Sequence, residues 1–62
     1  SKPIVLATPE QVAEITRLLA VVKLAEGEFE KLLTKADAES IGELNSEQAA
    51  KTLAWLNKKI TN

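Results

Sequence analysis

Two short motifs in this chain are typical of the first turn of an α-helix, and they restrict where its helices can begin. Residues 8–11 are Thr-Pro-Glu-Gln, and residues 45–48 are Asn-Ser-Glu-Gln. Each motif places a side chain that favours the N-cap three residues before a Gln, which is the spacing of a capping box. Pro9 strengthens the first motif, because its fixed φ and missing N–H suit the first helical position. We therefore expect helices to begin directly after Thr8 and Asn45.

The apolar residues that follow each motif recur at helical spacing. After the first motif they are Val12, Ile15, Leu19 and Val22, and after the second they are Ala49, Leu53, Leu56 and Ile60. Such spacing places each set on one face of a helix. The sequence predicts one helix over about residues 9–23 and another from residue 46 to about the lysines at 58–59.

A further helix is expected between these two, from about Glu26 to Ala36. Phe29, Leu32 and Leu33 would form its apolar face. Its start is weakly marked: Ala25 stands at the N-cap without a capping side chain. Gly27 would fall in the first turn, where Gly costs up to about 1 kcal/mol relative to Ala.

Residues 37–45 form the connection to the last helix. We expect Ser40 to cap a single turn over residues 41–44, either a simple turn or a short 3₁₀ piece, that places Ile41 and Leu44 under the bundle. The predicted fold class is therefore all-α, a small three-helix bundle with a short one-turn helical connector before the last helix. Residues 1–7 are expected to be a tether or the end of a linker, and residues 8–62 a single helical interaction domain.

The composition argues against catalysis. With no His and no Cys, the chain lacks the commonest general base, the thiolate nucleophile and the commonest metal ligands. Gly27 and Gly42 are isolated, so no phosphate-binding loop is present, and a core this small leaves no room for a ligand pocket. We expect a protein that is not an enzyme and that carries no cofactor and no metal. No apolar run approaches the roughly 18 residues of a membrane span, no secretory leader is visible, and a cytoplasmic location is expected.

The candidate binding site lies on the last helix. Lys51, Trp55, Lys58 and Lys59 fall at i, i+4, i+7 and i+8, beside the apolar face. A Trp flanked by ammonium groups suits an acidic peptide with an apolar end, and Trp is frequent at interface hot spots. The alternative is that Trp55 only covers the edge of the core. Arg17 is a further candidate, and Lys23, Lys31 and Lys35 would join the site only if the fold brought them near Trp55.

Three segments carry a resemblance to a known family. They are residues 14–19 (Glu-Ile-Thr-Arg-Leu-Leu), residues 41–49 (Ile-Gly-Glu-Leu-Asn-Ser-Glu-Gln-Ala) and residues 51–59 (Lys-Thr-Leu-Ala-Trp-Leu-Asn-Lys-Lys). Together they resemble the C-terminal domain of phage single-strand annealing recombination proteins of the Red beta type, in the same helix order from about Pro3 to Ile60. The helix around the Glu26-Gly27-Glu28 run departs most from that pattern.

The resemblance implies a docking domain that recruits partner proteins while a separate domain anneals DNA. The implied partners are a phage exonuclease and the acidic tail of the host single-stranded-DNA-binding protein, with the parent protein oligomeric on DNA. Two alternatives remain, a small nucleic-acid-binding domain and an oligomerisation domain. The net charge of −1 favours protein docking over phosphate binding, so direct DNA contact is expected to be weak.

Overall fold

The computed structural model describes residues 4–61, and within them the chain forms three α-helices and one 3₁₀ turn. These elements are α1 (Pro9–Val21), α2 (Glu28–Lys35), η1 (Ile41–Glu43) and α3 (Ser46–Thr61). The all-α fold class, the helix order and the one-turn connector are therefore confirmed. The start of the expected tether, residues 1–3, lies outside the described residues.

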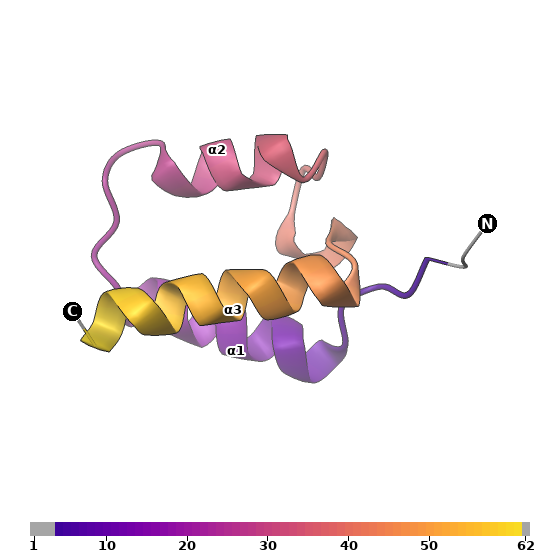
Figure 1. Ribbon diagram of the computed structural model, residues 1–62, viewed down its shortest axis with the longest axis horizontal. Helices are drawn as coiled ribbons and strands as arrows, with labels where there is room; N and C mark the ends of the chain where they lie inside the picture. The colour runs from indigo at the N-terminus through magenta and orange to yellow at the C-terminus, as the bar shows by residue number, and fades with distance from the viewer. Residues whose placement is uncertain (1–3, 62) are drawn as a thin grey trace.

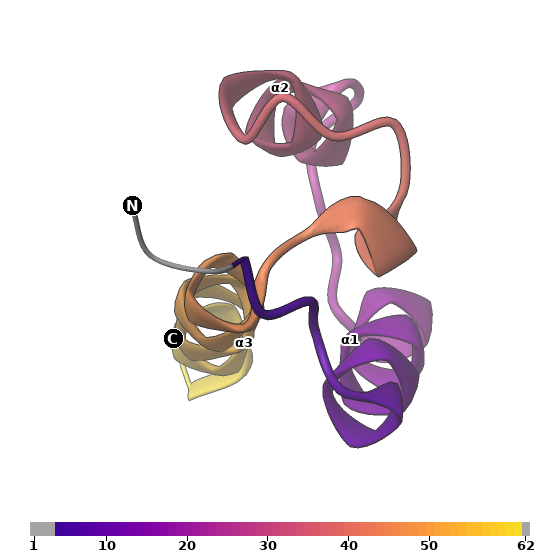
Figure 2. The same ribbon diagram turned by 90° about the vertical axis from the view of Figure 1, so that its right-hand side faces the viewer.

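The helices occupy three corners of the molecule. In Figure 1, α1 and α3 lie side by side and run in the same direction, while α2 runs the opposite way. Figure 2, a view from the end, shows η1 between α2 and α1. Consecutive helices are thus antiparallel, as short loops require, and the two helices of the tightest pair, α1 and α3, are parallel.

Both capping motifs form as the sequence predicts. The Gln11 N–H donates to Thr8 Oγ1 (3.1 Å) and the Thr8 N–H to Gln11 Oε1 (3.0 Å). At α3, the Gln48 N–H donates to Asn45 Oδ1 (2.7 Å) and the Asn45 N–H to Gln48 Oε1 (2.9 Å). The Gln11 amide also donates to the Ser46 carbonyl (3.2 Å), which aligns the first turns of α1 and α3.

The core is aliphatic and is centred between α1 and α3. Its largest fully buried side chains are Ile15, Leu18, Leu44 and Leu56. Ile60 is not part of it: the prediction that Ile60 continues the buried face of α3 was wrong, because its side chain is 50% exposed. With their first turns aligned, the 16 residues of α3 extend beyond the 13 of α1, so the last turn of α3 has no part of α1 opposite it. The polar residue Thr52, in the middle of α3, is buried, and its hydroxyl donates to the Gln48 carbonyl (2.8 Å).

The first two helices differ from the predicted bounds at their weakly marked ends. Helix α1 ends at Val21, two residues early, because Val22 adopts extended backbone. Helix α2 begins at Glu28, so Gly27 is its N-cap and not part of its first turn. Gly27 has a φ of 78°, in the left-handed region, and the Glu28 carboxylate accepts the Ala25 N–H (3.0 Å) in place of a capping side chain.

This geometry reverses the expected effect of Gly27 on stability. Replacing Gly27 by Ala is expected to destabilise the fold by about 1–2 kcal/mol, because L-residues are strained in the left-handed region. Gly42→Ala is the matched control: its φ is not positive and a Cβ there would meet only the Ser40 hydroxyl, at 4.0 Å. Urea denaturation of both variants measures the difference. A Gly27→Ala protein as stable as the Gly42→Ala protein would contradict the assigned backbone conformation.

The connector forms largely as expected. The turn η1 brings Leu44 into the core, and Ile41 packs half-buried against it. The expected cap by Ser40 was wrong, since its side chain makes no capping hydrogen bond. The turn is closed by backbone bonds from the N–H of Glu43 to the Ser40 carbonyl (3.1 Å) and from the N–H of Leu44 to the Ile41 carbonyl (3.1 Å). The Glu43 carboxylate also accepts the Glu39 N–H (3.3 Å).

The described part of the expected tether is held against the start of α3. The Ala7 N–H donates to the Leu44 carbonyl (2.9 Å) and the Ser46 N–H to the Val5 carbonyl (2.7 Å), on either side of an antiparallel bridge between Leu6 and Asn45. Only the backbone is engaged: the Ile4, Val5 and Leu6 side chains are exposed.

Candidate peptide-docking groove

A surface groove runs between α2 and α3. It consists of two adjoining hollows of about 320 and 380 Å³, both lined by Leu32 and Lys35. The first is completed by Glu28, Lys31 and Trp55. The second is completed by Ala36, Gln48, Lys51 and Thr52. We refer to the two together as the α2–α3 groove.

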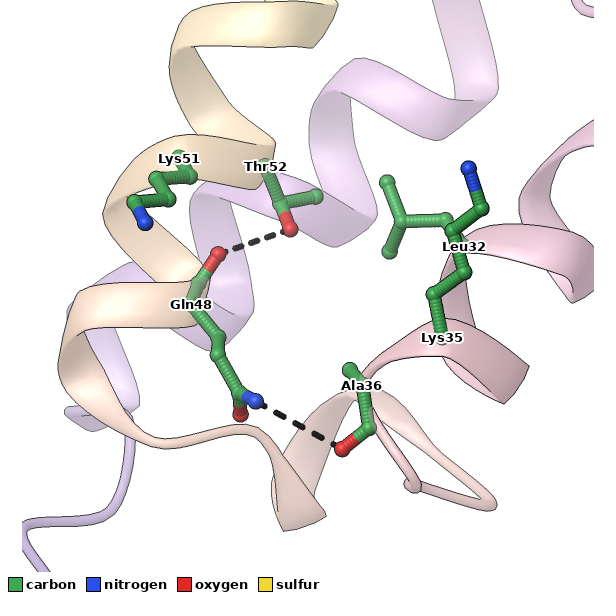
Figure 3. A pocket seen from close by; sticks show the side chains of 6 residues that line it. All are labelled: Leu32, Lys35, Ala36, Gln48, Lys51 and Thr52. Carbon is green, nitrogen blue, oxygen red and sulfur yellow. Dashed lines mark hydrogen bonds between the residues drawn. The ribbon is translucent and has the colours of Figure 1, made fainter.

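The groove exists because α2 stands away from α3. Helix α2 has eight residues and none of its side chains is fully buried. Figure 3 shows Leu32 pointing from α2 across the groove toward Thr52, with Lys51 at the outer edge on the α3 side. The prediction that so small a chain has no room for a pocket did not account for a hollow between two helices at the surface.

Polar contacts close the groove at both ends. At one end Lys59 Nζ lies 2.8 Å from Glu28 Oε2. At the other, the Gln48 amide donates to the Ala36 carbonyl at 3.5 Å, a long hydrogen bond (Figure 3). Between these two contacts the floor is made by side chains with apolar surface, chiefly those of Leu32 and Trp55.

Trp55 lies at the edge of the core, as one of the two alternatives from the sequence predicts, and it also faces the groove. Its half-buried ring packs against the hydrophobic core and also lines the groove. Lys59 Nζ lies 5.2 Å from the ring centroid, within the range of a cation–π contact. The ring is therefore a fixed apolar surface, held by the core on one side and by an ammonium group on another.

Three lysines give the groove a basic rim. Lys31 and Lys35 project from α2 and Lys51 from α3, and all three are exposed. Neither of the two ion pairs found in residues 4–61 involves these lysines: one joins Arg17 to Glu14 and the other joins Lys59 to Glu28. The rim lysines thus have no carboxylate partner within the described chain, and their charges are available to a ligand.

The other two cations of the predicted site lie apart from this groove. Lys58 is exposed and lines neither hollow. Arg17 lines a separate hollow between α1 and α3, beside Leu53, and its Nε lies 2.6 Å from Glu14 Oε1. This bond raises the pKa of Arg17 and lowers that of Glu14. Of the predicted site residues, Lys51 and Trp55 line the two hollows, and Lys59 reaches the end of the groove through its contacts with Trp55 and Glu28.

Glu28 is the one carboxylate that lines the groove. The hydrogen bond from Lys59 lowers its pKa, and the Ala25 N–H acts in the same direction. Its position in the first turn of α2 also favours the negative charge. Glu28 is therefore ionised at neutral pH.

The sequence analysis made Lys31 and Lys35 part of the site only if they lay near Trp55, and both line the hollow that Trp55 lines. It did not predict Leu32 as a site residue. Lys31 and Lys35 are four residues apart and so share a helix face, with Leu32 next to them. That spacing was visible in the sequence, but the direction in which the face points was not.

Residues 4–61 contain no cluster of acidic side chains able to hold a metal ion. In the same range, no helix is both long and apolar enough to cross a membrane. Searches of protein-family models, curated protein sequences and solved structures give no match to this chain.

Proposed function

We propose that this chain is a non-catalytic protein-docking module whose α2–α3 groove binds an acidic peptide with apolar residues at its end. The observation that carries the proposal is the pairing of an apolar floor, Leu32 and Trp55, with a rim of unpaired lysines. The floor would bury the apolar residues of the peptide, and the lysines would pair with its carboxylates.

This ligand chemistry suits the partners that the family resemblance implies. We propose a docking module of a phage-type single-strand annealing recombinase, acting in the cytoplasm. The acidic tail of the host single-stranded-DNA-binding protein would occupy the groove. The partner exonuclease would dock on the same surface or on the rest of the bundle.

The test is a titration of the chain with a synthetic peptide of several Asp residues followed by apolar residues at the C-terminus. Trp55 is the only Trp in the chain, so its fluorescence reports directly on the groove. We expect a saturable change in emission with the acidic peptide, and none with a peptide in which every Asp is Asn. Saturable binding of single-stranded DNA with a steep salt dependence, in place of the peptide, would overturn the proposal in favour of nucleic-acid binding.

Leu32→Ala is expected to weaken peptide binding by about fivefold, because it removes apolar contact area from the floor. Leu32 is half-buried and its truncation leaves the core intact. Val21→Ala is the control, since Val21 is 65% exposed and lies outside the groove. Isothermal titration of both variants gives the comparison, and equal loss in the two would remove Leu32 from the site.

Self-association is the second candidate function, favoured by the exposed side chains of the segment Ile4-Val5-Leu6. A pair of copies would bury these residues against each other, with the peptide groove left empty. Sedimentation over a range of concentrations tests this, and a monomer at every concentration would exclude it.

A further inference from the structure

Glu28 is the single acidic side chain that lines the groove, and it has no role in the proposed function. It is paired with Lys59 at the end of the groove. Lys59 Nζ lies 2.8 Å from Glu28 Oε2, and both side chains are about one-third exposed, at 32% and 30%. The same amine lies 5.2 Å from the Trp55 ring centroid. The Glu28 carboxylate is thus paired with a cation that also lies against the Trp55 ring of the apolar floor.

Glu28 is also held in place from its own side of the groove. Its Oε1 accepts the Ala25 N–H at 3.0 Å while Oε2 meets Lys59, so both oxygens are engaged. A carboxylate fixed in this way keeps its charge at the Trp55 end, whereas the three rim lysines, Lys31, Lys35 and Lys51, form no ion pair in the described chain. Charge is therefore distributed unevenly along the groove. Glu28 offsets part of the positive charge in the hollow that Trp55 lines, and no carboxylate lines the hollow that holds Lys35 and Lys51.

We propose that Glu28 is an internal competitor for the acidic peptide: it holds Lys59 and repels ligand carboxylates from the Trp55 end, so that they lie at Lys35 and Lys51. This inference rests on the proposed function of the groove and adds its selectivity. The apolar residues of the peptide would contact Trp55 and Leu32, next to Glu28, and the acidic residues would extend toward Gln48.

If Glu28 competes with the peptide, three variants should change the peptide affinity in different ways. Glu28→Gln releases Lys59 and removes the repulsion, so the acidic peptide should bind roughly two- to fivefold more tightly, the scale of an exposed ion pair. Lys59→Gln leaves the Glu28 charge uncompensated, so binding should weaken by a similar factor. The double variant removes both charges and should bind as the wild type does. Glu30→Gln is the matched control, since Glu30 is exposed on the same helix and carries the same charge without lining the groove.

The measurement is isothermal titration of each chain with the acidic peptide and with its Asn counterpart, beside circular dichroism to check helix content. A gain in Glu28→Gln that exceeds the gain in Glu30→Gln, and that is absent with the Asn peptide, supports the inference. Wild-type binding with no such gain overturns it and leaves the proposed function standing. Weaker binding in all three variants also overturns it, because the ion pair would then serve only to hold α2. No binding by any of the chains overturns both proposals.

Discussion

Replacing Leu56 by Ala is expected to cost about 2–5 kcal/mol of unfolding free energy, the range for truncating a fully buried Leu. Leu56 is 0% exposed and belongs to the core between α1 and α3. For a chain of 62 residues the total stability is about 3–9 kcal/mol, from the usual contribution per residue. At the middle of both ranges a single truncation here removes about half of the folding free energy. The chain has no Cys, so no disulfide compensates for the loss.

Urea denaturation followed by circular dichroism measures this loss. Ile60→Ala is the matched control, since it truncates an aliphatic side chain on the same helix that is 50% exposed. We expect that control to cost under about 1 kcal/mol, as substitutions at the surface usually do. Equal losses in the two variants would show that the last turn of α3 packs as firmly as its middle, contrary to the structure.

The contrast between Leu56 and Ile60 also shows the limit of reasoning from periodicity. Both residues belong to the same helical repeat. This repeat is a local property of the sequence, and it predicts the helix correctly. Burial depends on whether another element lies opposite, and the length difference between α1 and α3 decides that at Ile60. The caps of α1 and α3 were predictable for the converse reason, because each is completed by residues three apart in the chain.

The start of α2 was less predictable because its capping group is unusual. A Gly at the N-cap offers no side chain, and the carboxylate that bonds the Ala25 N–H comes from Glu28, inside the helix. Glu28 in turn is fixed by Lys59, which is 31 residues further along the chain. No local pattern contains that pairing, so the sequence placed the start of α2 two residues early.

The sequence predicted the part of the candidate site that lies on α3, but not the part that lies on α2. Trp55 and Lys51 stand out on α3 from composition and spacing, and the structure places both on the groove. The part on α2 depends on how α2 turns its faces: Leu32 and Lys35 meet α3, whereas Lys58, on α3 itself, does not line the groove. Helical spacing predicts which residues share a face of a helix. Which element that face contacts depends on how the helices pack against each other.

Reversing the charge of two rim lysines should have the largest effect on binding. The double variant Lys35→Glu/Lys51→Glu is expected to weaken binding of the acidic peptide by about tenfold, because each substitution replaces an attraction by a repulsion of similar size, about 0.2–1 kcal/mol for an exposed pair. Neither lysine belongs to the core, and both are exposed, so the fold should survive the change.

The matched control is Lys23→Glu/Lys58→Glu, which changes the net charge equally at exposed positions outside the groove. The comparison separates local pairing from the long-range field of the molecule, which both variants alter alike. Titrations at low and moderate salt should show the difference between the variants shrinking as salt rises, because ions screen exposed charges. If the control loses as much affinity as the groove variant, the peptide is attracted by net charge alone and the α2–α3 groove is not its site.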